Sequence, residues 1–453
     1  MKKNRIYLCL AHMSGNEQKY IQEAFDTNWV VPMGPNVNAL EADLENYVNS
    51  KMLIVNGEGW EETDDPQLGK ALRPTGDEYL HYKMIAGMDK KVVALSAGTA
   101  AVHLALLACG VGPGDEVMVQ SFTFCASSHP ITYLGATPVF VDSEKDTWNM
   151  DPQLLEEGIK DRIAKTGKKP KAIVAVYLYG MPGRIDEYVV IGKKYGIPLV
   201  EDAAEALGSR FDGQVCGTMG DYGVLSFNGN KMITTSGGGA LIVPNAEAKS
   251  KVMFYATQAR EAYPYYQHEK IGYNYRMSNV VAGVGRGQMT VLQEHIDHHK
   301  KVQRMYEDLL KDVSGICMHS QPGGGRYDAN YWLCTFTIDA SVKIKGQEKA
   351  YAKAISGAVG GAAGVTHAGG TLRTECEPND NVEALRMWMD EHQIECRPVW
   401  KPMHTQPCYK DAPRYLSGVS EDVFHQGMCL PTGPWVTEDD VRYVVDCIKD
   451  AIR

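Results

Sequence analysis

Between residues 92 and 243 the sequence alternates between short apolar runs and longer stretches with helical spacing. The apolar runs are rich in β-branched residues, which is typical of strands buried on both faces of a mostly parallel sheet. The alternation predicts an α/β layered domain that binds ligands at the carboxyl ends of its strands. The predicted strands are Val92–Leu95, Glu116–Gln120, Pro138–Val141, Ala172–Tyr177, Pro198–Val200, Gly223–Phe227 and Ala240–Val243, and the predicted helices are Thr99–Cys109, Pro152–Ile163 and Ile185–Lys194.

After residue 245 the pattern changes. Val281–Leu310 has apolar residues at helical spacing and predicts one long helix. Residues 331–338 (YWLCTFTI) predict a strand, and Val382–His392 and Asp439–Ile452 predict further helices. We therefore expect two domains, a large α/β domain over residues 1–245 and a smaller C-terminal α+β domain over residues 246–453.

Two segments interrupt this order. Residues 51–91 are polar and charged, with scattered glycine and proline, and residues 357–370 (GAVGGAAGVTHAGG) consist mainly of glycine and alanine. Both compositions predict loops or insertions.

Composition excludes several classes of protein. Hydrophobic residues make up 44% of the chain and charged residues 23%, so it is not disordered. No run reaches the roughly 20 apolar residues that span a bilayer, and the N-terminus does not predict a signal peptide. The net charge of −10 argues against a nucleic-acid partner. The 11 cysteines form no CxxC pair, so we expect reduced thiols, a cytoplasmic location and no metal site.

The clearest candidate chemistry lies in residues 223–239 (GVLSFNGNKMITTSGGG). A predicted strand ends at Phe227, and a short polar loop then presents Lys231. A lysine in this position can be partly desolvated and can form a Schiff base. On this segment alone, a solvated loop lysine is the simpler interpretation.

Other segments suit pyridoxal phosphate (PLP). Asp202 follows an apolar run and could pair with the protonated pyridine nitrogen, although it could also cap a helix. In residues 96–102 (SAGTAAV), backbone amides at a helix N-terminus could bind a phosphate, with Thr99 in the first turn and a hydroxyl from Ser226. An aromatic side chain from residues 121–125 (SFTFC) could stack on a flat cofactor. Together these features predict a PLP site.

Competing motifs are incomplete. The sequence has no GxxxxGK[ST] or GxSxG, and its glycine-rich segments lack the full dinucleotide fingerprint. His295, His298 and His299 have a spacing that could suit a metal, but charged residues lie between them. We interpret these histidines as an exposed helix face.

The motifs occur in the order SAGTAA, GDEV, SFTF, GATPVFVD, EDAAEALGS, LSFNGNK and GYNYRMSN. This order resembles the PLP-dependent sugar-nucleotide aminotransferases of the DegT/StrS type, from PMGP at residues 32–35 to PTG at residues 431–433. The longer stretches FNGNKMITTSGGG, YATQARE, GYNYRMSN and RPVWKPMHTQP look like the bacterial transaminases that make UDP-4-amino-4,6-dideoxy-N-acetylglucosamine, a precursor of bacillosamine. The resemblance implies the fold-type I aminotransferase architecture.

The resemblance also implies roles for individual residues. Lys231 would bind PLP covalently and then move a proton, and Asp202 would pair with the pyridine nitrogen. Glu205 would lie near the ring hydroxyl, where many relatives carry Gln or His. For the other positions it implies that Phe124 stacks on the ring, that Gly98, Thr99 and Ser226 bind the phosphate, that Asn274 reaches the phosphate of the neighbouring subunit's cofactor, and that Arg397 and His404 lie near the sugar nucleotide.

The implied reaction transfers an amino group from L-glutamate to the 4-keto carbon of a nucleotide-linked 4-keto-6-deoxy sugar, UDP-2-acetamido-2,6-dideoxy-hex-4-ulose, for surface glycan synthesis. A homodimer with composite active sites is implied as well. Three alternatives stay open: a GDP- or dTDP-linked substrate, a PLP-binding regulatory or sensory relative without turnover, and a sugar 3-dehydrase on the same fold. Lys231 argues against the dehydrase, because those relatives carry histidine at that position.

The chain departs from its relatives at two kinds of position. Most of residues 51–91 looks like an insertion, and the region near residues 341–380 looks longer than usual. Tyr177 stands where relatives commonly have histidine.

Overall fold

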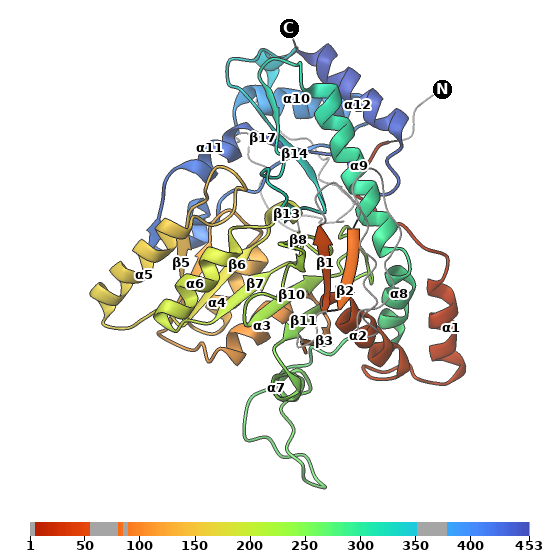
Figure 1. Ribbon diagram of the computed structural model, residues 1–453, viewed down its shortest axis with the longest axis vertical. Coiled ribbons are helices and arrows are strands. Elements are labelled where there is room, and N and C mark those ends of the chain that lie inside the picture. Colours follow the sequence, from red (N-terminus) through yellow and green to blue (C-terminus); the bar gives the residue numbers. More distant parts are fainter. Residues whose placement is uncertain (1–4, 55–79, 85–88, 351–377, 453) are drawn as a thin grey trace.

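The computed structural model describes residues 5–54, 80–84, 89–350 and 378–452. The larger of its two lobes is built on an eight-stranded sheet in the order β16-β5-β4-β6-β7-β10-β11-β3 (Figure 1). Neighbours from β16 to β10 pair in parallel, and β11 is antiparallel to both β10 and β3. The strands are β3 (Lys91–Leu95), β4 (Glu116–Gln120), β5 (Thr137–Val141), β6 (Ala172–Val176), β7 (Leu199–Asp202), β10 (Tyr222–Ser226), β11 (Gly239–Val243) and β16 (Arg414–Tyr415).

The prediction of a mostly parallel sheet buried on both faces is confirmed. Each predicted strand is present, with ends that differ by no more than two residues. Successive side chains of β3 point to opposite faces of the sheet and lie in different hydrophobic cores. Val92 and Ala94 belong to one core, and Val93 and Leu95 belong to the other. The predicted helices correspond to α3 (Gly98–Ala108), α5 (Pro152–Thr166) and α6 (Ile185–Tyr195).

Further helices complete the larger lobe. α7 lies against α3 and β3, and α8 lies against α1 and α2, although both α7 and α8 come after residue 245. The division of the chain near residue 246 therefore stays a prediction. These elements are α1 (Glu17–Asp26), α2 (Pro35–Val48), α4 (His129–Tyr133), α7 (Ala246–Ala256), α8 (Asn279–Met289) and α11 (Val419–Gln426).

The smaller lobe has a four-stranded antiparallel sheet in the order β12-β14-β17-β15. Its core joins this sheet to α9, α10 and α12, and it includes Ile6 from the N-terminal segment. Ile6 also pairs with Ile394 in an isolated bridge. The elements are α9 (Leu292–Leu310), β12 (Ile316–Met318), β14 (Cys334–Ile338), α10 (Asp380–Glu391), β15 (Arg397–Pro398), β17 (Gly427–Leu430) and α12 (Glu438–Ala451).

The prediction of one helix over Val281–Leu310 is wrong. The helix breaks between α8 and α9, where Thr290 N–H bonds to Gly287 O and Val291 N–H bonds to Gln288 O in tighter turns. Just before the break, α8 packs closely against the start of α1, where a Cβ on Gly287 would lie 2.7 Å from the backbone nitrogen of Glu17.

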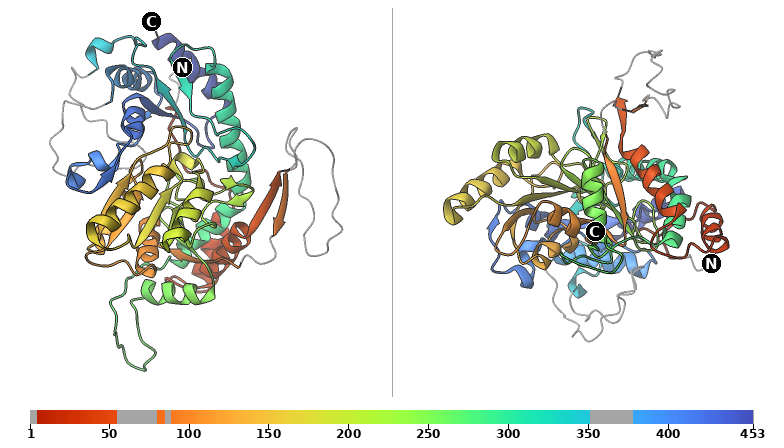
Figure 2. Two further views of the ribbon diagram at one scale, coloured as in Figure 1. Left: turned by 60° about the vertical axis from the view of Figure 1, so that its left-hand side comes forward. Right: turned by 90° about the horizontal axis from the view of Figure 1, so that it is seen from below.

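The proposed insertion over residues 51–91 is described only at its ends. β1 (Ser50–Ile54) and β2 (Leu80–Met84) form an antiparallel pair that projects from the larger lobe (Figure 2). β1 joins a small sheet with β9 (Gln214–Val215), β8 (Arg210–Phe211) and β13 (Tyr327–Asp328). The glycine- and alanine-rich residues 357–370 lie outside the described residues. No helix of the described chain has the length and apolar character needed to cross a membrane.

Candidate active site

Asp202 ends β7, and its side chain is buried at the carboxyl end of the parallel strands. Ser127 Oγ donates a hydrogen bond to Oδ2 at 2.6 Å, and Ala204 N–H donates to Oδ1 at 3.2 Å. Burial raises the pKa of Asp202, and these hydrogen bonds oppose the rise only in part. Such a carboxylate is stabilised by a cation placed opposite it, so the position suits a protonated ring nitrogen. Within the described chain, no helix begins directly after Asp202, so Asp202 does not cap a helix.

Lys231 lies on the loop between β10 and β11, and its side chain is only 13% exposed. Nζ is 3.3 Å from Glu205 Oε1 and 3.7 Å from the centroid of the Trp332 ring. The other oxygen of Glu205 accepts a hydrogen bond from Tyr179 N–H at 2.7 Å. The amine is held between a carboxylate and an aromatic face, so the interpretation as a solvated loop lysine is wrong.

Three chain segments converge at the N-terminus of α3. A Cβ on Gly98 would lie 3.0 Å from the Cβ of Ser226, and a Cβ on Gly239 would lie 2.4 Å from the backbone nitrogen of Gly98. The N-cap residue Ala97 makes no side-chain hydrogen bond to the first turn. The first N–H groups of α3, with the hydroxyls of Thr99 and Ser226, can therefore bind an anion such as a phosphate.

Four aromatic rings form a row that leads to Lys231. Phe124 is 50% exposed, and its ring centroid lies 5.3 Å from that of Trp400. Tyr179 stacks between Trp400 and Trp332, with centroid distances of 6.1 and 6.4 Å. Trp400 Nε1 is buried and has no hydrogen-bond partner in the described structure. The row therefore ends in the exposed ring of Phe124, and the neighbouring Trp400 has an indole N–H without a partner among the described residues.

The two predicted substrate residues differ in accessibility. The side chain of Arg397 is 40% exposed and donates from Nε and Nη2 to Glu395 Oε1. His404 is buried, with Nδ1 2.6 Å from Ser121 Oγ and Nε2 3.0 Å from Glu421 Oε1. His404 thus fixes a turn to the end of β4, whereas Arg397 keeps an open surface. No described contact joins either residue to Lys231.

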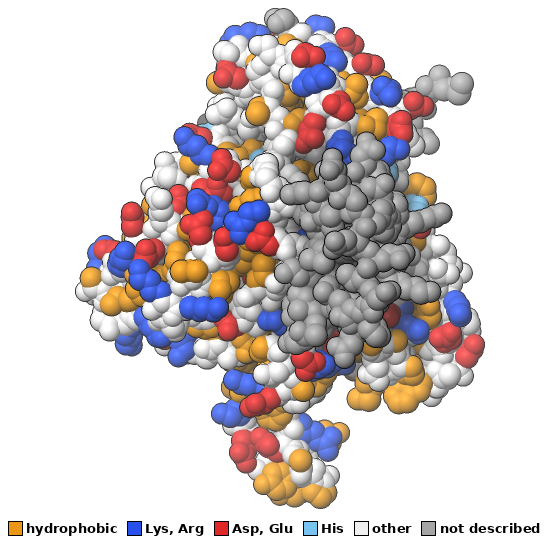
Figure 3. Space-filling view, viewed as in Figure 1, with side chains coloured by type: hydrophobic (Ala, Val, Ile, Leu, Met, Phe, Trp, Pro, Cys, Tyr) orange, Lys and Arg blue, Asp and Glu red, His pale blue; other side chains and the backbone are white. Residues whose placement is uncertain are grey.

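Asn274 is exposed and pairs with Thr257 where a long loop returns to the sheet. The neighbouring Tyr275 O accepts a hydrogen bond from Ser96 N–H at 2.8 Å, so this segment runs beside the N-terminus of α3. The loop between Thr257 and Asn274 projects from the lobe, with hydrophobic side chains at its end (Figure 3). The strongly exposed apolar residues of the loop are Tyr263, Tyr265, Tyr266 and Ile271.

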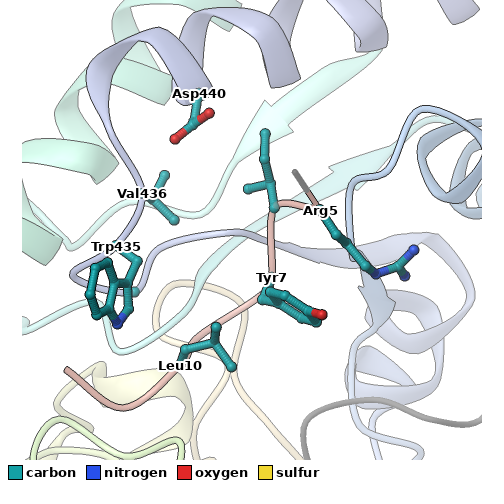
Figure 4. A pocket seen from close by; sticks show the side chains of 8 residues that line it. Arg5, Tyr7, Leu10, Trp435, Val436 and Asp440 are labelled. Atoms are coloured by element: carbon teal, nitrogen blue, oxygen red, sulfur yellow. The ribbon is translucent and has the colours of Figure 1, made fainter. Parts of the chain in front are cut away.

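A separate pocket of about 310 Å³ lies between the N-terminal segment and α12 (Figure 4). Trp435 and Tyr7 form part of its wall, and the carboxylate of Asp440 lies at its edge. None of the predicted site residues lines this pocket. Its position therefore does not identify the reaction centre.

The interpretation of the α9 histidines as an exposed face is wrong. His295 and His299 are buried, and their Nδ1 atoms lie 3.0 Å from Met232 O and Tyr331 O. Burial lowers the pKa of His295 and lowers the pKa of His299 to about 3, so both rings are neutral at pH 7. A neutral imidazole can be buried when it donates to a carbonyl. No group of three potential metal ligands is present among the described residues.

Comparison with known proteins identifies the family. A model of the DegT/DnrJ/EryC1/StrS aminotransferase family matches residues 83–359 and 363–449. The chain belongs to this family. Its members include the putative pyridoxal phosphate-dependent aminotransferase EpsN of Bacillus subtilis, to which this chain is 38% identical over 98% of its own length and 95% of that protein's.

A further relative and a solved structure are similar to the chain over nearly its whole length. The GDP-perosamine synthase of Escherichia coli O157:H7 is 27% identical over 97% of this chain and 96% of its own. The solved PLP form of the putative sugar aminotransferase Spr1654 from Streptococcus pneumoniae superposes with a TM-score of 0.74 at 21% identity, over 99% of this chain and 98% of that one. The solved structure shows the shared fold, and membership of the family makes the protein a PLP-dependent aminotransferase of nucleotide sugars.

Three neighbours of the predicted residues were missed from the sequence. Ser127 bonds to Asp202, Trp332 lies under Lys231, and Trp400 contacts Phe124. The sequence pattern places Trp332 only in a predicted strand. Ser127 stands four residues after Thr123, and nothing in that spacing indicates a contact with Asp202. A tryptophan next to a predicted substrate segment, as in RPVWKP, was the one available hint.

Proposed function

We propose that the protein transfers the amino group of L-glutamate to the 4-keto carbon of UDP-2-acetamido-2,6-dideoxy-hex-4-ulose in the cytoplasm. The product is UDP-4-amino-4,6-dideoxy-N-acetylglucosamine. The observation that carries the proposal is the shielded Lys231 amine, which lies beside Glu205 on a sheet edge shared with Asp202. The longer sequence motifs around this lysine support the choice of sugar.

The described residues fit PLP. When bound, PLP supplies an aldehyde that an amine can capture and a ring that accepts the electron pair of a breaking bond. The amides of α3 and the hydroxyls of Thr99 and Ser226 would hold the phosphate. Asp202 would pair with the ring nitrogen, Glu205 would lie near the ring hydroxyl, and Phe124 would cover one face of the ring.

Lys231 has two roles in this proposal. Its Nζ would bind the aldehyde of PLP with loss of water. Once the donor amine has displaced it, Nζ would take the proton from the donor α-carbon as a general base and deliver it to the C4′ carbon of the cofactor as a general acid. Glu205 Oε1, 3.3 Å away, keeps the amine in reach of the reacting carbon. The ring of Trp332, whose centroid is 3.7 Å from Nζ, limits the motion of the amine and shields it from water.

We also propose a homodimer with composite sites, in which Asn274 contacts the cofactor phosphate of the neighbouring subunit. The projecting loop supports this proposal, because Tyr265, Tyr266 and Ile271 are at least 60% exposed and would be buried by a second copy. Arg397 remains available to a phosphate of the nucleotide. His404 acts on the substrate only through the turn that it holds.

A substitution at the proposed phosphate site tests the cofactor assignment. Gly98→Ala should weaken PLP binding about tenfold, because its Cβ would crowd Ser226 at 3.0 Å and displace the anion donors. PLP affinity is measured by titrating cofactor-free protein and following the absorbance of the bound cofactor. Gly112→Ala is the control, since nothing lies within 4 Å of its Cβ. Equal PLP affinity in the two variants would contradict the proposed phosphate site.

The substrate proposal is tested with a panel of nucleotide sugars. Purified protein, PLP and glutamate are incubated with 4-keto-6-deoxy sugars linked to UDP, GDP or dTDP, and the amino sugar and 2-oxoglutarate are measured. We expect kcat/KM for the UDP-linked N-acetyl sugar to exceed the others by about a hundredfold. A preference for the GDP-linked sugar would replace our choice, in line with the GDP-perosamine synthase relative. PLP binding without turnover of any substrate would favour the regulatory alternative.

A further inference from the structure

The two carbonyl groups that flank Lys231 are both held by ring N–H donors. Trp332 Nε1–H donates to Asn230 O at 2.6 Å, and His295 Nδ1–H donates to Met232 O at 3.0 Å. A carbonyl oxygen only accepts hydrogen bonds, so the proton of His295 must reside on Nδ1. The backbone on each side of the lysine is therefore fixed by a buried donor from outside its own loop.

A second histidine on the same helix fixes the tryptophan. His299 is fully buried, and its Nδ1–H donates to Tyr331 O at 3.0 Å. Tyr331 has a left-handed backbone with φ of 50°, which a non-glycine residue adopts only when its surroundings hold it there. The next residue, Trp332, places its ring 3.7 Å from Lys231 Nζ.

The other ring nitrogen of His295 faces His12. Because its Nδ1 carries the proton, Nε2 is an acceptor, and His12 Nδ1 lies 3.2 Å from it. His12 must then donate. Burial lowers the pKa of His295, which favours the neutral ring whose Nε2 can accept a hydrogen bond from His12.

Helix α9 is suited to carry these donors. Its N-terminal part, with Leu292 and Ile296, lies in the core of the larger lobe, and Val302 and Tyr306 lie in the core of the smaller lobe. Residues four apart lie on one face of a helix, so His295 and His299 act from the same side. A rigid helix anchored in both lobes thus contacts both supports of the lysine.

We propose that His295 and His299 are positioning residues that hold Lys231 at its reacting distance, His295 through Met232 and His299 through Trp332. This inference rests on the proposed role of Lys231. It explains the HIDHH segment, which the cofactor and substrate assignments leave unused. His298 does not belong to the pair, because its Nε2 lies 3.1 Å from the distant Gly433 O.

The test compares His295→Phe, His299→Phe and His298→Phe, each loaded with PLP. The first readout is the pH midpoint of the visible absorbance of the bound cofactor, which reports the environment of the lysine nitrogen. We expect this midpoint to move by about one pH unit in His295→Phe and His299→Phe, because the distance between Nζ and Glu205 is no longer fixed. kcat should fall about tenfold in both, with KM for the sugar nucleotide nearly unchanged.

The control and rescue variants separate positioning from stability. His298→Phe should lower the unfolding midpoint but leave the absorbance midpoint and kcat unchanged. His295→Gln, which keeps an N–H donor, should recover most of the wild-type absorbance midpoint. If His299→Phe does not fold, His295→Phe and His12→Phe carry the test, with a smaller shift expected for His12→Phe.

Two results would overturn the inference. The first is an absorbance midpoint that stays at the wild-type value in a folded, PLP-loaded His295→Phe protein. The second is an identical shift in His298→Phe. If borohydride treatment of the wild-type protein attaches no cofactor to Lys231, the proposed function itself is overturned. The two failures are therefore distinguishable.

Discussion

Lys231→Ala should no longer retain PLP covalently, and its turnover should fall by about a thousandfold or more, since one side chain supplies both the nucleophile and the proton carrier. Borohydride treatment followed by mass spectrometry of the Lys231 peptide measures attachment, and 2-oxoglutarate formation measures turnover. The loss should be specific to this lysine, because its amine contacts Glu205 and the ring of Trp332 in the proposed site.

Lys300→Ala provides a matched control. Lys300 is also a poorly exposed lysine paired with a carboxylate, Asp328, but it lies on α9 outside the proposed site. This variant should retain PLP and wild-type kcat. A Lys231→Ala protein that aminates the sugar as fast as Lys300→Ala would refute the proposed mechanism.

Asp202→Asn should lower kcat by about a hundred- to a thousandfold, because a neutral amide no longer stabilises a protonated ring nitrogen and the ring becomes a poorer electron acceptor. Ser127 can still donate to the amide oxygen, so the geometry is largely retained. The measurement is kcat at saturating PLP, together with PLP affinity. Ser127→Ala should have a smaller effect of about tenfold, since it removes one hydrogen bond to the carboxylate.

The neighbouring residue on β7, Glu201, provides a control. It tests whether the loss in Asp202→Asn comes from the missing charge or from the change of a buried carboxylate. Glu201 is buried, but its carboxylate bonds to Tyr177 OH and to the N–H groups of Gly217 and Gly220. Glu201→Gln should therefore lower the unfolding temperature and leave kcat per folded molecule unchanged. Equal losses of kcat in Asp202→Asn and Glu201→Gln would assign the effect to disruption of β7.

Local sequence pattern was sufficient for the sheet. Strands such as β4 and β6 are short apolar runs buried on both faces, and this property is visible in the residues themselves. The proposed cofactor-binding segments follow from the sequence for a related reason. Gly98, Asp202 and Ser226 lie at or close to the carboxyl ends of such runs, and parallel strands bring their carboxyl ends to one edge of the sheet.

The missed features depend on partners that are distant in the sequence. His295 was interpreted as exposed because its neighbours on α9 are polar, yet its acceptor, Met232, lies 63 residues away. The last turn of α8 likewise packs against Glu17, which is distant in the sequence and approaches Gly287 closely. The contact of Trp332 with Lys231 joins two residues that are far apart in the sequence, so helical or strand periodicity carries no information about it.

The N-terminal segment has a consequence for how the chain folds during synthesis. Ile6 N–H bonds to Gln393 O, and Glu395 N–H bonds to Ile6 O, so this segment belongs to the core of the smaller lobe. At a ribosomal rate of about 5 to 20 residues per second, its partners emerge roughly 20 to 80 seconds after it does. The first residues made are thus among the last to find their place, and a nascent chain that stalls before residue 393 leaves them without their strand partner.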